Sequence, residues 1–473
     1  MTTYLPTIGL EIHAELKTKS KMFCGCANNP DESHPNSFIC PVCMAHPGTL
    51  PVVNEVAVEQ VLRVGEAING TIATFTEFDR KNYFYPDIPK NYQISQYKYP
   101  LISGGKIGDV TVTRIHLEED TARSVHSAVG SKVDFNRAGV PLMELVTDPV
   151  IHDAKTAVSF AKELRLVLKY LDASDANLEK GEMRIEANIS VAREGEVLGT
   201  KVEVKNLNSF KAVEQAIEFE IKRHLEMLKR GENIIQETRG WDENKQKTFS
   251  QRIKEESHDY RYYPDPDIPK FFLDEIPRFN KLVLQESLPQ LPWELRKIYV
   301  EEGMKDQTVE LLVGNQELNT LYQNVLKFLE KKEDSVLTAN YLTSDIMGLL
   351  SKQNYTGKQI EDMDAKEFAE LIGLISNKIL SSRGAKDVLA IWVQEGGSPK
   401  AIAERINVIQ ISDDSELQLV ITRIISENSL LVEEYKKGKD SVLQFLIGLG
   451  MKATRGAANP EKLTDLLRKE LKS

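Results

Sequence analysis

Apolar and polar residues alternate in three segments of the first half of the chain, which predicts three β-strands. In residues 8–16 the apolar side holds Ile8, Leu10, Ile12, Ala14 and Leu16, and the polar side Glu11, His13 and Glu15. In residues 183–191 the apolar side holds Met183, Ile185, Ala187, Ile189 and Val191, and the polar side Arg184, Glu186, Asn188 and Ser190. In residues 200–206 Val202 and Val204 stand opposite Lys201, Glu203 and Lys205. A turn joins the last two segments, so we expect a hairpin with Glu186 and Glu203 on one face.

Helical spacing replaces this alternation in two later segments of the same half. Residues 153–172 read as an amphipathic helix capped by Asp153, and residues 211–232 as a second helix that stops at Gly231. The stretch "LPQLPWELRK" has two prolines and indicates a domain boundary.

Beyond this boundary the pattern is helical to about residue 405, with expected interruptions at Gly357, Gly384 and "EGGSP". A final helix is expected to have Asn459 as N-cap and Pro460 at its first position. Its apolar face holds Leu463, Leu466, Leu467 and Leu471. We therefore predict an α+β protein: a domain of residues 1–293 with an antiparallel sheet, an all-α domain of residues 294–405, and a small all-α tail of residues 406–473.

Composition and charge exclude several classes of protein. The 473 residues are 41% hydrophobic and 28% charged, as in an ordinary globular protein, and no apolar run approaches the ~20 residues that span a bilayer. The N-terminus lacks the features of a signal peptide, which predicts a cytoplasmic protein. The net charge of −11 argues against a protein that coats nucleic acid over its whole surface. Residues 431–473 nevertheless carry nine Lys/Arg and six Asp/Glu, a local excess of positive charge.

All four cysteines lie between residues 24 and 43, in two close pairs: Cys24 with Cys26, and Cys40 with Cys43. Two pairs joined by a flexible loop are typical of a tetrahedral zinc site, and a site closed by four sulfurs leaves no position for substrate. Two disulfides, or four unrelated thiols, are the alternatives. Reduced thiols in a cytoplasmic protein favour zinc in a structural role.

The polar sides of the three strands carry the strongest chemical signal. Carboxylates with one imidazole suit magnesium or manganese, and the lysines suit phosphate. The segment "VTVTRIHLEEDTARS" adds Glu118, Glu119 and Asp120 at a strand end, but does not reveal whether Glu118 or Glu119 faces inward. For any one strand alone, a solvated outer face is the preferred interpretation, and it is the three strands together that favour a binding face.

Two further clusters interleave charged and aromatic residues, as binding loops and core-packing loops both do. The first, "FDRKNYFYPDIPKNYQISQY", contains Arg80, Lys81 and Tyr83, and the second is "QRIKEESHDYRYYPDPDIP". The chain has no phosphate-binding glycine motif and no G-x-S-x-G, so short motifs do not disclose a nucleotide site or a serine nucleophile.

Seven segments in order resemble the GatB family of the bacterial aspartyl/glutamyl-tRNA amidotransferases over essentially the whole chain. They are "GLEIHAEL", "DRKNYFYPDIPKNYQISQY", "IHLEED", "VDFNRAGVPLMELV", "KVEVKNLNSF", "DYRYYPDPDIP" and "LIGLGMKATRGAANP". The archaeal GatE proteins share the motifs of the first domain but have an inserted domain for which this chain has no room. The resemblance implies a cradle domain related in fold to glutamine synthetase, followed by helical and tail domains.

The resemblance also implies a reaction. ATP phosphorylates the side-chain carboxylate of glutamate on tRNA(Gln), or of aspartate on tRNA(Asn), and ammonia then displaces the phosphate. Which of these tRNAs is served is left open by the sequence. The implied partners are the amidase GatA, which supplies ammonia, the small protein GatC and the charged tRNA, which the basic tail binds.

By position in the family's motifs, magnesium is held by Glu11, His13, Glu118 or Glu119, Glu186 and Glu203. Lys81 and Lys205 join these residues in the implied catalytic set, and ATP is expected at Arg80, Lys81, Tyr83, Lys201 and Lys205. Glu186 replaces an aspartate that is common in the family, and Gly450 stands where many members have glutamine. A zinc-stabilised tRNA-binding module without catalysis is the competing interpretation.

Overall fold

The computed structural model describes residues 3–196, 198–253, 260–352, 355–410, 414–436, 438–454 and 458–472. Lys254 and Asp259, which belong to the second charged and aromatic cluster, lie outside these ranges. The chain divides into two compact units, residues 1–292 and 293–473, and each is described by itself. A division of the second unit near residue 405 stays a prediction.

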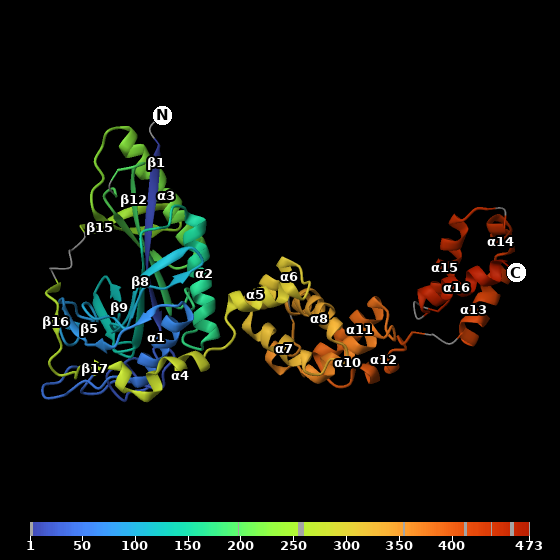
Figure 1. The fold of residues 1–473 in the computed structure, drawn as a ribbon, viewed down its shortest axis with the longest axis horizontal. Helices are drawn as coiled ribbons and strands as arrows, with labels where there is room; N and C mark the ends of the chain where they lie inside the picture. The colour runs from blue at the N-terminus through green and yellow to red at the C-terminus, as the bar shows by residue number, and fades with distance from the viewer. Residues whose placement is uncertain are drawn as a thin grey trace. The chain divides into compact units, whose positions relative to one another are not determined.

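The first unit is built on a ten-stranded sheet, shown in Figure 1. Its strands, from one edge to the other, are β15 (Lys247–Ile253), β14 (Glu237–Asp242), β13 (Val202–Leu207), β12 (Met183–Arg193), β1 (Tyr4–Glu15), β11 (Pro141–Thr147), β8 (Val110–Glu119), β6 (Ile102–Ser103) and β2 (Thr71–Ile72), with β7 (Lys106–Ile107) also on β8. The α+β class is confirmed. The sheet, expected to be antiparallel, is mixed because β13 and β14 are parallel. A parallel pair needs a long crossover, and α3 (Phe210–Lys229) provides it.

The alternation predicted for the long strands is confirmed by burial. The apolar sides of β1 and β12 are almost completely buried: Ile8, Leu10, Ile12, Ala14, Met183, Ile185, Ala187, Ile189 and Val191 are at most 3% exposed. Helix α2 (Ala154–Tyr170) contacts β1, and α3 contacts β12, β13 and β15. The two helices lie side by side (Figure 1) and cover the apolar face, which leaves the polar side chains on the other face.

The ends of these helices follow the sequence signals. Asp153 caps α2, and its carboxylate accepts a hydrogen bond from the Thr156 backbone amide at 2.8 Å. Helix α3 begins at Phe210, one position earlier than predicted, and Ser209 is its N-cap. The chain leaves α3 at Gly231, whose φ of 75° favours glycine because it has no Cβ.

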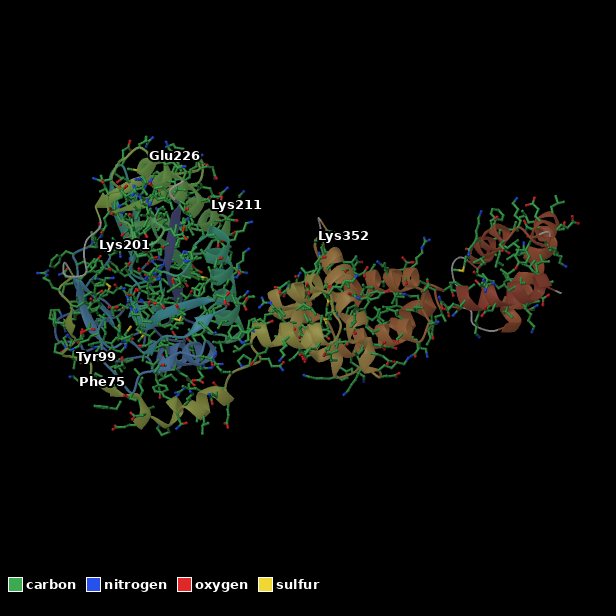
Figure 2. All side chains as sticks on the ribbon, turned by 45° about the horizontal axis from the view of Figure 1, so that its top comes forward. Phe75, Tyr99, Lys201, Lys211, Glu226 and Lys352 are labelled. Atoms are coloured by element: carbon green, nitrogen blue, oxygen red, sulfur yellow. The ribbon has the colours of Figure 1, made fainter. Side chains whose placement is uncertain are left out.

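Smaller elements complete the first unit. They are α1 (Glu55–Ala67), α4 (Lys281–Glu286), a three-stranded sheet of β16 (Tyr263–Pro264), β4 (Asp79–Asn82) and β5 (Tyr92–Ser95), and the strand pairs β9 (Arg123–Ser127) with β10 (Gly130–Asp134) and β3 (Phe75–Thr76) with β17 (Phe271–Phe272). Phe75 and Tyr99 lie edge to face with ring centroids 5.1 Å apart. Figure 2 labels the two residues next to each other. Strand β5 lies against β8, so the small sheet borders the polar face.

The second unit is helical. Its α-helices are α5 (Pro292–Glu301), α6 (Asp306–Gly314), α7 (Gln316–Leu326), α8 (Ser335–Asn340), α9 (Met347–Leu350), α10 (Ala365–Ser376), α11 (Ser382–Glu395), α12 (Pro399–Arg405), α13 (Asp414–Glu427), α14 (Ser429–Lys436), α15 (Ser441–Ala453) and α16 (Pro460–Lys472). The interruption predicted at Gly384 is wrong: this residue lies in the first turn of α11, where its amide donates to the Ser381 side chain at 3.1 Å. A Cβ there would lie 3.2 Å from the Cβ of Val408, so glycine serves close packing.

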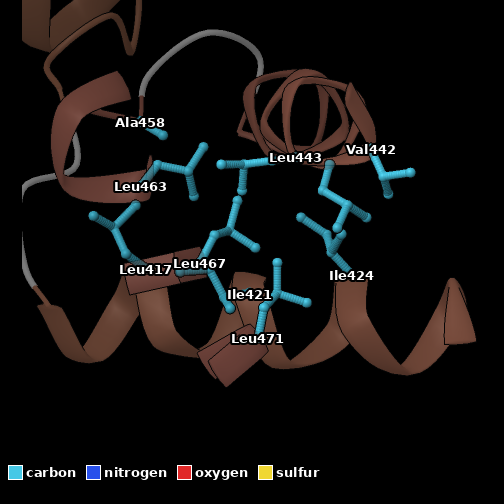
Figure 3. Packing of buried hydrophobic residues seen from close by; sticks show 10 residues of the cluster. Leu417, Ile421, Ile424, Val442, Leu443, Ala458, Leu463, Leu467 and Leu471 are labelled. Atoms are coloured by element: carbon cyan, nitrogen blue, oxygen red, sulfur yellow. The ribbon is translucent and has the colours of Figure 1, made fainter. Parts of the chain in front are cut away.

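Helices α13, α15 and α16, with Ala458 just before α16, form a core of ten buried residues (Figure 3): Leu417, Ile421, Ile424, Val442, Leu443, Leu446, Ala458, Leu463, Leu467 and Leu471. Helix α14 packs partly buried residues against this core. The prediction for the final helix is confirmed, since Asn459 accepts from the amides of Glu461 and Lys462. Gly450 belongs to this packing, because a Cβ there would lie 2.7 Å from Leu463 Cδ2. A glutamine at this position would force Leu463 to move.

Among the described residues, no helix is long and apolar enough to cross a membrane.

Candidate metal and phosphoryl-transfer site

Four neighbouring strands of the large sheet place a row of polar side chains on the face opposite α2 and α3. In the pairing register, His116 on β8 lies opposite Glu144 on β11, Glu144 opposite His13 on β1, and His13 opposite Arg184 on β12. Glu11 and Glu186 form the cross-strand pair two positions away from His13 and Arg184. Directly opposed residues on one face are within contact distance, so the register alone brings these groups together.

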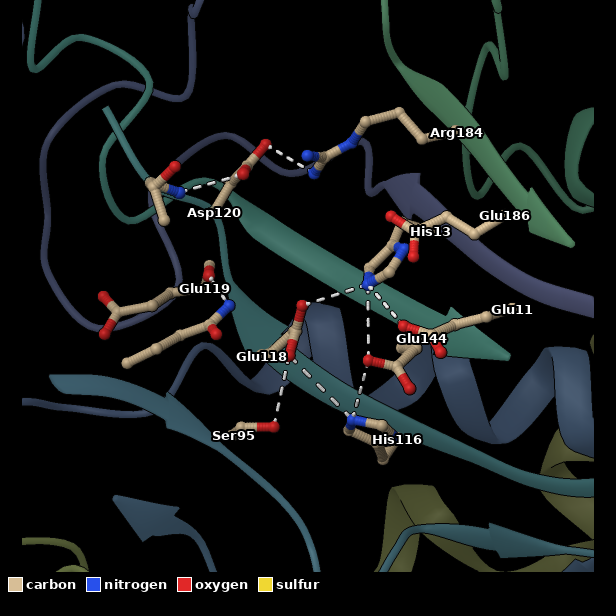
Figure 4. A network of polar contacts seen from close by, with 12 residues as sticks. Glu11, His13, Ser95, His116, Glu118, Glu119, Asp120, Glu144, Arg184 and Glu186 are labelled. Atoms are coloured by element: carbon tan, nitrogen blue, oxygen red, sulfur yellow. Dashed lines mark hydrogen bonds and ion pairs between the residues drawn. The ribbon is translucent and has the colours of Figure 1, made fainter. Parts of the chain in front are cut away.

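His13 is the centre of the contacts, as Figure 4 shows. Its Nε2 lies 3.3 Å from a carboxylate oxygen of Glu144, 3.5 Å from one of Glu118 and 4.0 Å from one of Glu11. His116 Nε2 approaches Glu144 at 3.5 Å from the other side. Among the residues that the structure describes, the buried Nδ1 atoms of both histidines have no hydrogen-bond partner.

Burial and neighbouring groups together set the pKa values of His13 and Glu11. Burial disfavours the charged form of His13, but hydrogen bonds to Glu118 and Glu144 outweigh it and hold the pKa of His13 well above its ordinary value. Burial, followed by the charges of Glu144 and Glu186, raises the pKa of Glu11 to about 7. A carboxylate that keeps a proton near neutral pH lacks sufficient positive charge around it.

Glu203 on β13 extends the cluster to a second set of carboxylates. Ligand atoms of Glu11, Glu186 and Glu203 lie within 4.8 Å of one another, and so do those of Glu11, His13 and Glu144. Lys205 Nζ lies 2.7 Å from Glu186 and 3.8 Å from Glu203. Burial opposes the charge of Lys205, but Glu186 and Glu203 raise the pKa of this lysine. Two oxygen-rich donor sets that share Glu11 fit magnesium or manganese.

The structure distinguishes the two neighbouring glutamates that the sequence could not. Glu118 faces His13 and also accepts a hydrogen bond from the Ser95 hydroxyl at 3.2 Å. Glu119 points to the opposite side, where Lys90 lies 2.7 Å away and the Ile94 amide donates at 3.0 Å. Glu118 therefore belongs to the cluster, and Glu119 does not.

The residues expected at ATP separate into two groups. Lys81, Tyr83 and Lys205 line a cavity of about 470 Å³. Arg80 does not line it, because its guanidinium pairs with Asp265 at 2.8 Å and Asp267 at 2.9 Å. Lys201 is exposed and precedes β13.

The four cysteines meet in the loop that follows β1. Their sulfur atoms lie within 4.8 Å of one another, and Cys40 and Cys43 are 3.9 Å apart, close to the ~3.8 Å edge of a tetrahedron with zinc–sulfur bonds of about 2.3 Å. A hydrogen bond from Cys24 and the charge of nearby Lys21 help to lower the pKa of Cys43 to about 5. The thiolate is the form that binds zinc. The set fits one structural zinc ion.

The loop is tied to the strands of the carboxylate cluster. The Met22 amide donates to the Gly139 carbonyl at 2.7 Å, and the Gly139 amide donates to the Asp120 carbonyl at 2.9 Å. Asp120 directly follows β8, the strand of His116 and Glu118.

Comparisons with known proteins agree with this geometry. The family model described as the GatB/GatE catalytic domain matches residues 6–276, and the GatB domain matches residues 323–471. The B subunit of the aspartyl/glutamyl-tRNA(Asn/Gln) amidotransferase of Thermoanaerobacter sp. (strain X514) is 41% identical over 482 residues, with 99% of both chains covered. Its counterpart in Crocosphaera subtropica is 41% identical over 494 residues, with 99% of this chain and 98% of the relative covered. The chain belongs to the GatB family of these amidotransferases.

Two members of the cluster, His116 and Glu144, were not singled out from the sequence of this GatB family member. Both lie inside quoted motifs, "IHLEED" and "VPLMELV". Glu144 is buried in the middle of the otherwise apolar strand β11, and a carboxylate in an apolar run needs a partner. This was the signal that could have identified it.

We predict that the purified protein holds about one zinc ion, and that Cys40→Ser loses it. With only three thiolates the loop is no longer fixed by zinc. The melting temperature should therefore fall by more than the rate of phosphoryl transfer at temperatures where the protein stays folded. Metal analysis and thermal unfolding measure the two effects, with Ser33→Ala as a control in the same loop. Mass spectrometry that found two disulfides and no zinc would contradict this prediction.

We also predict that magnesium binds this protein more weakly in acid. Because the pKa of Glu11 is raised in the folded state, its ionisation lowers the free energy of unfolding of the magnesium-free chain as pH rises through 7. Bound magnesium offsets this loss, but it binds the carboxylate only after Glu11 is ionised. Between pH 8 and pH 6 the ionised fraction of Glu11 falls about tenfold, so the magnesium affinity should fall by at least about this factor.

Magnesium titrations followed by thermal unfolding at both pH values test this dependence. Glu15→Gln is the matched control, because burial also raises the pKa of Glu15 to about 7 while its ion-pair partner is Arg137, at 2.7 Å. Glu15→Gln should keep the pH dependence of the magnesium effect. Glu11→Gln should reduce it to the part due to His13, whose pKa is also raised and which must lose its proton before it can bind the cation. Equal magnesium affinities of the unaltered protein at pH 6 and pH 8 would show that Glu11 does not bind the cation.

Proposed function

We propose that this chain is the kinase and transamidase component of a complex that converts Glu-tRNA(Gln), Asp-tRNA(Asn) or both into the amidated aminoacyl-tRNAs. In the first step the γ-phosphoryl group of ATP is transferred to an oxygen of the substrate's side-chain carboxylate, and ADP leaves. In the second step ammonia attacks the activated carbon and inorganic phosphate leaves. A carboxylate is a poor electrophile, and phosphorylation supplies its leaving group.

The observation that carries this proposal is the pair of donor sets that share Glu11 on one sheet face. We assign Glu11, His13, Glu118 and Glu144 to one set, and Glu11, Glu186 and Glu203 to the other. Magnesium held by them would neutralise charge on the ATP phosphates and on the substrate carboxylate. The longer arm of Glu186 is accommodated, since its carboxylate reaches both Lys205 and the donor set.

Lys81 and Lys205 are proposed to contact the transferred phosphoryl group from the cavity beside this face. Lys81 is held between aromatic rings, with Nζ 5.0 Å from the centroid of Tyr260 and 5.9 Å from that of Tyr83. Although burial opposes its charge, Glu118 and other neighbouring groups keep the pKa of Lys81 well above its ordinary value. A cation at the edge of a carboxylate cluster is suited to attract phosphate oxygens. Arg80 of β4, held by two aspartates, is assigned a structural role and not a role in ATP binding.

The remaining assignments concern partners. The four cysteines gather in a set that suits zinc, and thiolates bound to zinc are not available as nucleophiles that release ammonia from glutamine. We therefore assign the release of ammonia to the amidase GatA, with the small protein GatC also in the complex. Zinc is proposed to be structural. The basic tail is proposed to bind tRNA, because Lys and Arg side chains contact its phosphates.

We predict that Glu203→Gln lowers transfer of the labelled γ-phosphate from ATP to charged tRNA by about two to three orders of magnitude. The change keeps the size of the side chain but removes the charge that balances the cation. Zinc content, tRNA affinity and basal glutamine hydrolysis by the partner amidase should persist. Glu196→Gln, at an exposed position after β12, is the matched control. Phosphorylation at the unaltered rate would favour a tRNA-binding module in which this face is only solvated.

We predict that deletion of residues 411–473 weakens tRNA binding by the complex while the partner's glutaminase remains active. Arg468→Ala and Lys469→Ala, at exposed positions of α16, should each reduce the salt slope of binding by about one unit if they contact phosphate. Filter binding over a range of salt concentrations measures both effects. An unchanged tRNA affinity after the deletion would place tRNA recognition outside the tail.

A further inference from the structure

A buried hydroxyl lies directly against Glu203. The Thr238 Oγ1 donates a hydrogen bond to Glu203 Oε2 at 2.7 Å, and the two residues are only 1% and 5% exposed. They oppose each other in the parallel pairing of β13 with β14. The sheet itself therefore places this hydroxyl next to the carboxylate.

A break in the strand pairing separates Thr238 from its neighbour in the chain. The register of β14 with β15 shifts between Thr238 and Arg239, as at a β-bulge. Thr238 faces Glu203, whereas Arg239 reaches the fully buried Glu220 of α3 at 3.2 Å, on the helix-covered face. Bulges commonly redirect side chains next to functional sites.

The Glu220 carboxylate anchors this part of the sheet from its other face. It also accepts from Arg223 at 2.7 Å and from the Thr248 hydroxyl of β15. Arg239 of β14 and Thr248 of β15 thus hold both strands against α3, and Arg223, on α3 itself, is a third donor to the same carboxylate. Thr238 consequently lies on a strand that is fixed from behind.

The hydroxyl opposes the attraction of a nearby lysine. Lys205 lies 3.8 Å from Glu203 Oε2 and 2.7 Å from Glu186, so a freely rotating Glu203 would be drawn into a closer ion pair with it. The bond from Thr238 holds Oε2 at its present position. A hydrogen bond to a ligating carboxylate fixes its orientation toward the metal.

We propose that Thr238 is a positioning residue, which holds the Glu203 carboxylate in the orientation that binds a divalent cation together with Glu11 and Glu186. This inference rests on the proposed function, because it takes Glu203 as a cation ligand. Thr238 itself touches neither the cation nor the substrate.

The test uses the assembled complex and Mn²⁺ as the probe, counted by electron paramagnetic resonance. The relevant ion is the one whose binding is lost in Glu203→Gln. Thr238→Val keeps the shape of the side chain and removes the hydroxyl, so the affinity for this ion should fall by about 10- to 100-fold. Thr238→Ser restores the hydroxyl and should restore the affinity.

Kinetics separate positioning from a general structural defect. In Thr238→Val the magnesium concentration for half-maximal phosphoryl transfer should rise, while the rate at saturating magnesium is largely recovered. Thr7→Val is the matched control, the same exchange at a buried threonine of β1, and should leave both quantities unchanged. In the double variant with Glu203→Gln, removal of the hydroxyl should weaken cation binding no further than Glu203→Gln alone does.

The outcomes distinguish this inference from the proposed function. If Glu203→Gln loses an ion and Thr238→Val binds it normally, the positioning role is wrong and the metal site stands. If Thr238→Ser behaves like Thr238→Val, or Thr7→Val is equally impaired, the effect is one of packing and the inference is overturned. If the unaltered complex binds no ion that depends on Glu203, the proposed site fails and the role of Thr238 fails with it.

Discussion

The mutual repulsion of buried carboxylates is the constraint on which the rest of this structure depends. Glu11, Glu118, Glu144, Glu186 and Glu203 project from neighbouring strands of one sheet onto one face. Burial and proximity make these negative charges costly, and nearby cations such as His13 and Lys81 are needed to hold the pKa values of Glu118 and Glu144 below the ordinary value. The protein's own cations, among them His13 and Lys205, balance only part of this charge, since the pKa of Glu11 is still raised to about 7. A divalent cation is the natural completion of such a site.

The other face of the sheet makes this arrangement tolerable. The apolar sides of β1 and β12 are packed beneath α2 and α3, so burial of apolar surface stabilises the strands whose polar sides repel one another. Rigid strands then hold the carboxylates in place, and the loops around them hold the edges. The cysteine loop is joined through Gly139 to the end of β8, and the Glu220 network joins β14 and β15 to α3. Structural zinc would thus fix the loop beside the carboxylates, and the divalent cation would fix the carboxylates themselves.

The sequence predicted most reliably what depends on neighbouring positions along one strand or helix. Alternation identified the polar sides of β1, β12 and β13, and the capping residues Asp153 and Asn459 marked helix starts. The choice between Glu118 and Glu119 needed the partner strands, because adjacent residues point to opposite faces and only pairing reveals which face is functional.

The features that the sequence did not reveal depend on contacts between distant segments. Glu144 reaches His13 from a strand some 130 residues away, through a register that no local pattern specifies. Arg80 was expected at ATP, but its guanidinium pairs with Asp265 and Asp267, which are far from it in the sequence. Gly384, expected to interrupt a helix, instead allows the close approach of Val408.

The central claim is that the carboxylate face holds divalent cations next to the reacting phosphate. Its most direct test is anomalous X-ray diffraction from crystals of the complex soaked with Mn²⁺ and a non-hydrolysable ATP analogue. We expect manganese peaks about 2.0–2.3 Å from oxygens of Glu11 and Glu203 and from His13, with the γ-phosphate bound to the same ions. Manganese peaks only at surface carboxylates, with the analogue bound away from Lys81 and Lys205, would contradict it.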